Sequence, residues 1–203
     1  MFLLKPCLVR NACASILATL AAIVVLASPA VASSGGANNI VTASSRVDNQ
    51  VSTRSALQLS YVGGDTLTST NIADATTDAC TLCEANAVAI QVVISTGSPT
   101  TVTPANVASA TNLSCTSCVA YAYAYQYDVT TNGPATLSAD AQQQIATLRR
   151  RAQELAATRL APDDLAGAQT LTAELDDVAS QVKAVVDANL HPVGAQAVRS
   201  VDG

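Results

Sequence analysis

The sequence predicts an α+β fold in which an N-terminal all-β repeat domain precedes a C-terminal hairpin of two helices. Residues 71–97 and 106–132 align at an offset of 35 residues with 12 of 27 positions identical, which indicates an internal repeat. Within each copy, small and bulky side chains alternate with a period of two, as in strands. From residue 138 onward the apolar spacing changes to three and four, as in helices.

The first 32 residues have the features of a secretory signal peptide. Lys5 and Arg10 precede an apolar stretch over 16–27, and small residues at Ala30 and Ala32 suit a signal peptidase. The alternative is an uncleaved membrane anchor, but the stretch is short for a span of about 20 apolar residues. We expect a secreted or cell-envelope protein that has no membrane segment after cleavage. Residues 33–46 are rich in Ser, Gly and Asn and predict a flexible leader.

Residues 47–134 predict the β-repeat domain, a sandwich or short solenoid of about three units of about 35 residues. Two units are clear, and a degenerate first unit includes Ala56-Leu57-Gln58. Alanine is a poor strand former, so a helix over 85–93 is the alternative; the β-branched flanks and the tyrosine alternation favour strands. We expect the bulky side to be core and the flat alanine side to let another layer approach closely.

Glutamines recur at one phase of the repeat, at Gln58, Gln91 and Gln126. If equivalent strands lie side by side, these three amides would form a row and bond to one another. That hypothesis requires the three residues to be neighbours in the fold.

Each complete unit contains a CxxC motif between its two predicted strands, Cys80/Cys83 in one and Cys115/Cys118 in the other. Structural disulfides are the first interpretation, because the compartment is oxidising and the number of cysteines is even. A zinc site with four cysteine ligands is the second, although the 31-residue gap exceeds the usual spacing. A redox pair is the third, but neither motif precedes a helix that would lower a thiol pKa.

Four tyrosines fall on one side of the last predicted strand: Tyr121, Tyr123, Tyr125 and Tyr127. Such a stripe is a possible stacking surface for a sugar or another flat ligand. It is more often core or a contact between layers, because tyrosine buries a large apolar ring.

Residues 138–190 predict the helical hairpin. Ser138 is a candidate N-cap for a helix to about residue 160, and Pro162 opens a second helix whose apolar seam continues to about Leu190. His191-Pro192 ends it, and we expect residues 191–203 to form a loose tail.

The composition excludes several function classes. The chain has a net charge of −5 and no basic patch, which argues against nucleic-acid binding. His191 is the single histidine, and the sequence contains no HExxH, nucleophile-elbow, P-loop or dinucleotide-binding motif. We therefore expect no cofactor and no enzymatic activity.

The repeated unit Asn-x-Ala-x-Ala, Cys-x-x-Cys, Ala-x-Ala-x-Gln resembles the cysteine-pair units of uncharacterised secreted proteins of actinobacterial type. The resemblance covers about residues 54–132, implies no established activity, and is broken by the missing cysteines of the first unit. We expect a secreted or cell-surface structural or interaction protein with an unknown protein or envelope partner, or with self-association. A secreted binding module for a sugar or zinc is the alternative, and a thiol–disulfide oxidoreductase comes third.

Overall fold

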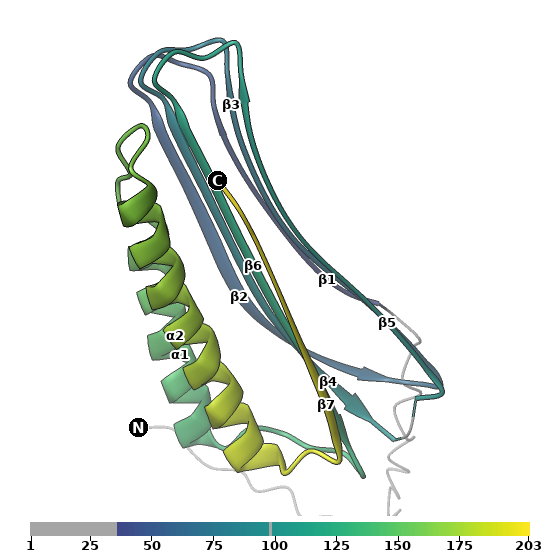
Figure 1. The fold of residues 1–203 in the computed structure, drawn as a ribbon. Coiled ribbons are helices and arrows are strands. Elements are labelled where there is room, and N and C mark those ends of the chain that lie inside the picture. The colour runs from purple at the N-terminus through teal and green to yellow at the C-terminus, as the bar shows by residue number, and fades with distance from the viewer. Residues whose placement is uncertain (1–35, 98) are drawn as a thin grey trace, which may run out of the picture. The chain divides into compact units, whose positions relative to one another are not determined.

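The structure is a computed structural model that describes residues 36–97 and 99–203 (Figure 1). The predicted signal peptide lies outside the described residues. Within those ranges the chain forms six strands, then two helices, then a last strand. The strands are β1 Ala37–Ser45, β2 Val51–Gly63, β3 Thr66–Asp78, β4 Glu84–Thr96, β5 Thr101–Leu113, β6 Val119–Thr131 and β7 Gly194–Asp202, and the helices are α1 Ala139–Ala156 and α2 Leu165–Leu190. The predicted α+β class is confirmed.

The first six strands divide alternately between two sheets. The three-stranded sheet has the order β1-β3-β5, and the four-stranded sheet has the order β2-β4-β6-β7, with only β7 antiparallel to its neighbour. The chain therefore crosses from one sheet to the other at every bend. The β4–β6 register pairs Ala85 with Ala120 and Gln91 with Gln126, which is the 35-residue offset of the sequence repeat. The extended conformation predicted for residues 85–94 and 120–129 is confirmed.

Small side chains fill the layer between the two sheets. The buried members of this inner layer are Val41, Ala43, Ala73, Ala75, Ala85, Ala87, Ala89, Ala120, Ala122 and Ala124. Because alanine ends at Cβ, the two sheets can approach closely with few gaps. This packing explains why residues with low strand propensity form strands here: their burial between sheets outweighs the intrinsic preference.

The bulky side of the four-stranded sheet packs under the two helices. Ile90, Tyr121 and Tyr123 on the sheet belong to one buried cluster with Leu148 on α1 and Leu175 on α2. Figure 1 shows both helices covering this face, on the side away from β1, β3 and β5. The bulky side is thus the main core, as the sequence predicts.

The helix ends follow local capping rules. The Ser138 hydroxyl accepts from the N–H of Ala141 at 3.2 Å, so the predicted N-cap is confirmed. The second helix begins at Leu165 rather than at Pro162, because the side chain of Asp164 caps the N–H of Gly167 at 2.8 Å. His191 ends that helix with a left-handed backbone, φ 46°.

The predicted loose tail is wrong, because residues 194–202 form strand β7 along the edge of β6. Side chains of β7 also reach the other sheet: Ser200 Oγ and Asp202 Oδ2 accept from the N–H groups of Ala108 and Ala110 at 3.1 and 2.9 Å. The tail therefore covers edge groups of both sheets, which would otherwise be open to pairing with another chain.

The predicted flexible leader is also wrong over most of its length, because residues 37–45 form strand β1. Its side chains alternate regularly between buried and exposed, so its small residues match the inner layer although few of them are strong strand formers. The described part of the chain contains no helix that is long and apolar enough to cross a membrane.

Candidate functional site

The two CxxC motifs lie in consecutive bends that stack on each other, residues 79–83 between β3 and β4 and residues 114–118 between β5 and β6. Equivalent residues in the two bends have left-handed backbones: Ala79 and Leu82 have φ 51° and 55°, and Ser114 and Ser117 have φ 50° and 53°. Backbone hydrogen bonds join the bends, including Leu82 N–H to Thr116 O at 3.0 Å. The repeated bend conformation places each cysteine of one motif over its equivalent in the other.

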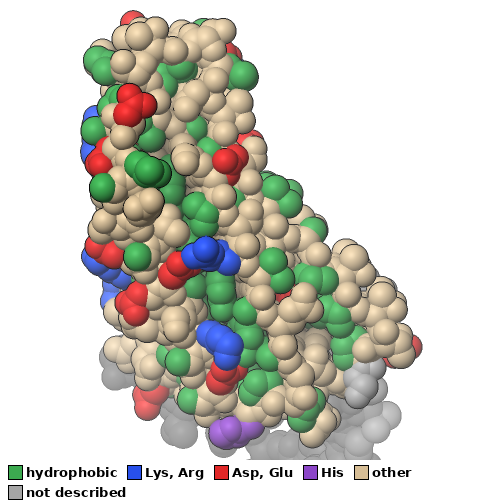
Figure 2. Space-filling view, viewed as in Figure 1, with side chains coloured by type: hydrophobic (Ala, Val, Ile, Leu, Met, Phe, Trp, Pro, Cys, Tyr) green, Lys and Arg blue, Asp and Glu red, His purple; other side chains and the backbone are tan. Residues whose placement is uncertain are grey.

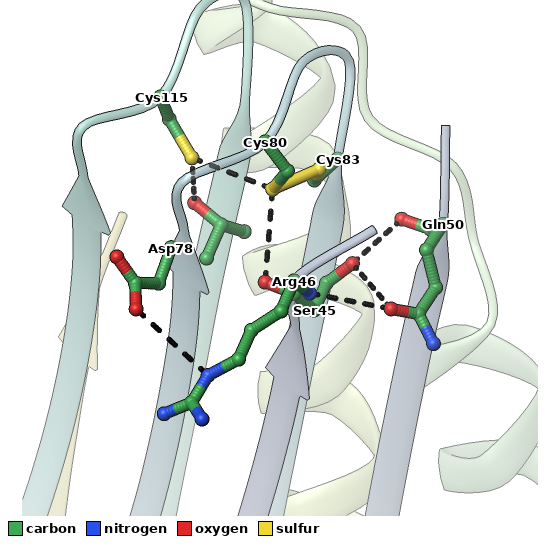
Figure 3. Close-up of polar contacts among 8 residues, drawn as sticks. Ser45, Arg46, Gln50, Asp78, Cys80, Cys83 and Cys115 are labelled. Carbon is green, nitrogen blue, oxygen red and sulfur yellow. Dashed lines mark hydrogen bonds and ion pairs between the residues drawn. A yellow bond between two sulfur atoms is a disulfide. The ribbon is translucent and has the colours of Figure 1, made fainter. Parts of the chain in front are cut away.

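The stacking brings three cysteine sulfurs together, those of Cys80, Cys115 and Cys118, and Figure 3 shows the contact between Cys80 and Cys115. Cys80 Sγ lies 3.6 Å from Cys115 Sγ and 4.0 Å from Cys118 Sγ, and these three sulfurs all lie within 4.8 Å of one another. Cys80 is also disulfide-bonded to Cys83, whereas Cys115 and Cys118 are thiols. The structure therefore combines a disulfide in one bend with a dithiol in the next.

The two thiols differ in acidity. Burial tends to raise the pKa of Cys115, but hydrogen bonding with Cys118, Thr77 and the backbone of Cys80 outweighs burial and lowers that pKa below its ordinary value. Burial and the neighbouring Cys115 raise the pKa of Cys118. Cys115 is therefore the thiol that ionises first, and only the thiolate is a strong nucleophile or metal ligand.

The first bend, residues 46–50, has polar side chains in place of cysteines. Gln50 Oε1 accepts from the hydroxyl of Ser45 and the N–H of Arg46 at 3.3 and 3.2 Å (Figure 3). Asp48 accepts from the N–H of Thr81 at 2.8 Å. In this bend, side-chain hydrogen bonds stabilise the backbone, and the bend itself contains no cysteine. The cysteine cluster is thus confined to two of the three bends at this end of the strands.

The tyrosine stripe is not an exposed stacking surface, which corrects its possible role in binding. Tyr121, Tyr123 and Tyr127 are at most 1% exposed, and Tyr125 is half-buried. Their hydroxyls bond to α2: Tyr121 to Thr172 at 2.9 Å, Tyr123 to Asp176 at 3.0 Å, and Tyr127 to Asp187. Burial raises the pKa of Tyr121 to about 12 and raises that of Tyr123 further, since Asp176 also disfavours the phenolate.

The three glutamines lie side by side, as the hypothesis requires. Gln58 pairs in register with Gln91, and Gln91 with Gln126. The hydrogen bonds of their amides go elsewhere, however: Gln58 donates to Ser60 at 3.1 Å and Gln126 donates to Ser69 and Asp128. Neither amide atom of Gln91 has a partner among the described residues. The three glutamines are therefore neighbours in the sheet, as predicted, but their amides do not hydrogen-bond to one another.

Asparagines form the hydrogen-bonded row instead. Asn39 donates to Asn71 Oδ1 at 2.9 Å, and Asn71 donates to Asn106 Oδ1 at 2.7 Å. The same amides also donate across the inner layer to backbone carbonyls of the four-stranded sheet, those of Ile90, Ala89, Tyr125, Ala124 and Val198. We call these three residues the asparagine ladder. Sequence reasoning missed its role, although Asn71 and Asn106 open the repeated Asn-x-Ala-x-Ala motif.

Asp128 is a buried carboxyl group next to the glutamine row. It is 5% exposed, and its carboxylate accepts from Ser69 Oγ at 3.4 Å and from Gln126 Nε2 at 3.2 Å. Burial raises its pKa above the ordinary value, and the two hydrogen bonds only partly oppose that effect. In the described ranges no basic side chain forms an ion pair with it.

We expect Asp128→Asn to stabilise the protein at neutral pH. A raised folded-state pKa gives stability that is fully present below the unfolded-state pKa and is lost as the pH rises through the folded-state pKa. The asparagine removes this loss, and its Oδ1 can still accept the hydrogen bond from Gln126 Nε2. Urea unfolding at pH 7 should show a gain of about 1 kcal/mol or more, on the scale of desolvating a buried polar group. The gain should shrink toward pH 4, and the exposed Asp65→Asn control should show neither effect.

Comparisons with known proteins give no relative for this chain: no family model, curated protein or solved structure matches it.

Proposed function

We propose that the protein is an exported structural or interaction protein, in which three repeat units form a short solenoid with a disulfide in one bend and present one sheet face to a protein partner. The N-terminal signal pattern and the disulfide Cys80–Cys83 support export to an oxidising compartment. The tyrosines are engaged in holding α2 to the sheet. The tyrosine hydroxyls that the sequence analysis singled out therefore stabilise the fold. The outer face of the three-stranded sheet is the surface that we propose for contact with a partner.

The single observation that carries the proposal is a row of β-branched residues across that outer face, with a half-buried residue, Ile72, between two exposed ones. Ile40 pairs in register with Ile72, and Ile72 with Val107, one residue from each strand. Ile40 is 63% exposed and Val107 is 46% exposed. An apolar row on a regular sheet, bordered by polar groups, is typical of a protein-binding patch.

One carboxylate, Asp74, lies next to Ile72 on the outer face, in register with Thr42 and Ser109. The other neighbours of the row on this face are mainly hydroxyl-bearing: Thr42, Ser44, Thr66, Thr68, Thr70, Thr76, Thr101, Thr103, Ser109 and Thr111. In Figure 2, charged side chains gather mainly over α2 and β7, whereas the part of the molecule formed by β5 is mainly uncharged. The tyrosine stripe, which was the candidate stacking surface for a sugar, is buried and faces α2 rather than this sheet face. The outer face therefore favours a protein partner over a carbohydrate.

Photo-cross-linking in the producing culture tests the proposal. A benzoylphenylalanine residue at Val107 should give a discrete higher-mass adduct after irradiation, and one at Gln143, exposed on α1, should not. An adduct of twice the chain mass identifies self-association as the contact.

We expect Ile40→Asp in the Val107 cross-linking variant to reduce the adduct at least tenfold, because a carboxylate in the row must be desolvated on contact. Asn38→Asp adds the same charge to the same exposed face outside the row and should leave the adduct unchanged. Equal adducts at Val107 and Gln143, or an adduct that survives Ile40→Asp, would contradict a role for the row.

Metal binding is the second candidate function, because the sulfur cluster favours it. Tetrahedral zinc with Zn–S bonds of about 2.3 Å has sulfurs about 3.8 Å apart, and the observed separations are 3.6 and 4.0 Å. In a fully reduced chain Cys83 would supply the fourth thiolate. Cys7 and Cys13 lie in the predicted signal peptide and are replaced by serine so that uncleaved chain adds no further thiols. Cobalt titration of reduced protein carrying Cys7→Ser and Cys13→Ser should then give a thiolate charge-transfer band at one equivalent, which Cys115→Ser weakens. Absence of the band would contradict metal binding by the cysteine cluster.

A further inference from the structure

The cysteine cluster holds a nucleophile next to a bond that it can attack. Cys115 is a thiol whose sulfur lies 3.6 Å from Cys80 Sγ, and Cys80 is bonded to Cys83 (Figure 3). Cys118 completes the arrangement as the second thiol of the same bend, 4.0 Å from Cys80 Sγ. Thiol–disulfide exchange requires a thiolate that can reach one sulfur of a disulfide.

We propose that the Cys115/Cys118 dithiol and the Cys80–Cys83 disulfide form one exchange site, in which the disulfide moves between the two bends through a Cys80–Cys115 linkage. This inference deepens the proposed function. It rests on that function in one respect, namely that one cysteine pair is oxidised to a disulfide in the exported protein. The reactants at this site are a thiol and a disulfide. The first disulfide that the Cys115/Cys118 dithiol attacks is the one in the neighbouring bend of the same chain.

The chemistry balances within the chain. The Cys115 thiolate attacks Cys80 Sγ, the Cys80–Cys83 bond breaks, and Cys83 leaves as a thiolate that takes up the proton lost by Cys115. The Cys118 thiolate then attacks Cys115 Sγ and expels Cys80 as a thiolate, which takes up the proton lost by Cys118. One pair is oxidised by two electrons and the other is reduced by two, so no external oxidant is needed.

The surroundings suit these roles. Cys115 is the attacking thiol because its sulfur lies nearer to Cys80 Sγ, at 3.6 Å, and Cys118, the other thiol of the same bend, is the resolving one at 4.0 Å. Backbone hydrogen bonds hold the bends together, with Thr116 N–H to Cys80 O at 3.2 Å and Val119 N–H to Cys83 O at 2.9 Å. Adjacent strands lie about 4.8 Å apart, and a disulfide accepts Cα separations of about 4.4–6.8 Å, so the linkage between bends needs little backbone movement.

The cysteines of the two bends differ in exposure. Cys115 and Cys118 are half-buried, and Cys118 lines a cavity of about 370 Å³ together with Tyr121 and Leu165. Cys80 and Cys83 are only 5% and 1% exposed. Thiols in the bend of residues 79–83 must therefore be labelled after the protein is unfolded.

A trapping experiment tests the linkage on the full chain carrying Cys7→Ser and Cys13→Ser. Adding Cys83→Ser and Cys118→Ser leaves Cys80 and Cys115, which should form a disulfide in most molecules under a glutathione redox buffer. The matched control carries Cys80→Ser and Cys118→Ser, leaving the diagonal pair Cys83 and Cys115, and it should retain two thiols. Non-reducing peptide mapping gives the result, and two free thiols in the trapping variant would overturn the proposal.

A second measurement decides the question even if a serine variant fails to fold. The Cys7→Ser, Cys13→Ser chain is prepared with one disulfide by limited reduction and is then blocked with N-ethylmaleimide in denaturant after increasing delays, so that the buried Cys80 and Cys83 are labelled as readily as Cys115 and Cys118. Exchange predicts that the label spreads with time over both CxxC motifs. Label that remains on one motif at every delay excludes exchange, and it leaves the proposed interaction function intact because photo-cross-linking at Val107 tests that function separately.

Discussion

Ala89→Leu is expected to destabilise the protein by about 3 kcal/mol or more, at or above the upper end for overpacked cores. Ala89 is fully buried in the inner layer, in register with Ala56 and Ala124. Its carbonyl accepts from Asn71 at 3.1 Å, so the opposing sheet lies directly over it. A leucine would have to separate the sheets or adopt a strained rotamer.

Urea unfolding followed by circular dichroism measures this effect. Ala105→Leu is the matched control, because Ala105 lies exposed on the outer face of β5, where the same substitution should change stability by less than about 0.5 kcal/mol. Equal tolerance of leucine at both positions would mean that the alanine side does not face a second sheet.

Asn71→Ala is expected to destabilise the protein by about 3 kcal/mol, because it removes the central member of the asparagine ladder. Asn71 Nδ2 donates to Asn106 Oδ1 and to the carbonyls of Ala89 and Tyr125, and its Oδ1 accepts from Asn39. The alanine leaves buried groups unpaired, each at a cost of about 1–3 kcal/mol.

The neighbouring Asn38→Ala provides the control, since Asn38 is exposed on the outer face of β1 and should change stability by less than about 0.5 kcal/mol. The loss should appear as a lower urea midpoint at an unchanged slope. A loss at Asn71 no larger than that at Asn38 would show that the ladder does not bridge the sheets.

The strands and their faces could be predicted because the repeat displays the period-two pattern twice at one offset. Ala122 and Tyr123 illustrate the rule: the small residue lies between the sheets and the bulky one lies under the helices. The helices could be predicted from their apolar spacing and from the Ser138 cap.

Two segments could not be predicted, because their structure comes from tertiary contacts. β1 lacks the apolar alternation that marks a strand in sequence, and it is ordered by pairing with β3. β7 is mostly exposed and owes its conformation to the edge of β6. A segment whose strand state depends on a neighbour's backbone groups leaves a weak mark in its own sequence.

The cysteine cluster could be predicted only in part. Spacing and compartment indicated disulfides or a metal site, but they did not show that Cys115 lies against Cys80 rather than only near Cys118. That contact follows from the stacking of the bends, which depends on the parallel order of both sheets. The apolar row Ile40, Ile72 and Val107 on the outer face was missed for the same reason, since its members come from three different strands.

Native-state hydrogen exchange read by mass spectrometry tests the central claim most directly, namely that β4 and β6 are covered on both faces, by the inner alanine layer and by the helices. The amides of residues 84–96 and 119–131 should exchange last, close to the rate of global unfolding, whereas those of β1 at the sheet edge should exchange earlier. Exchange of β4 and β6 as fast as that of β1 would contradict the stacked arrangement.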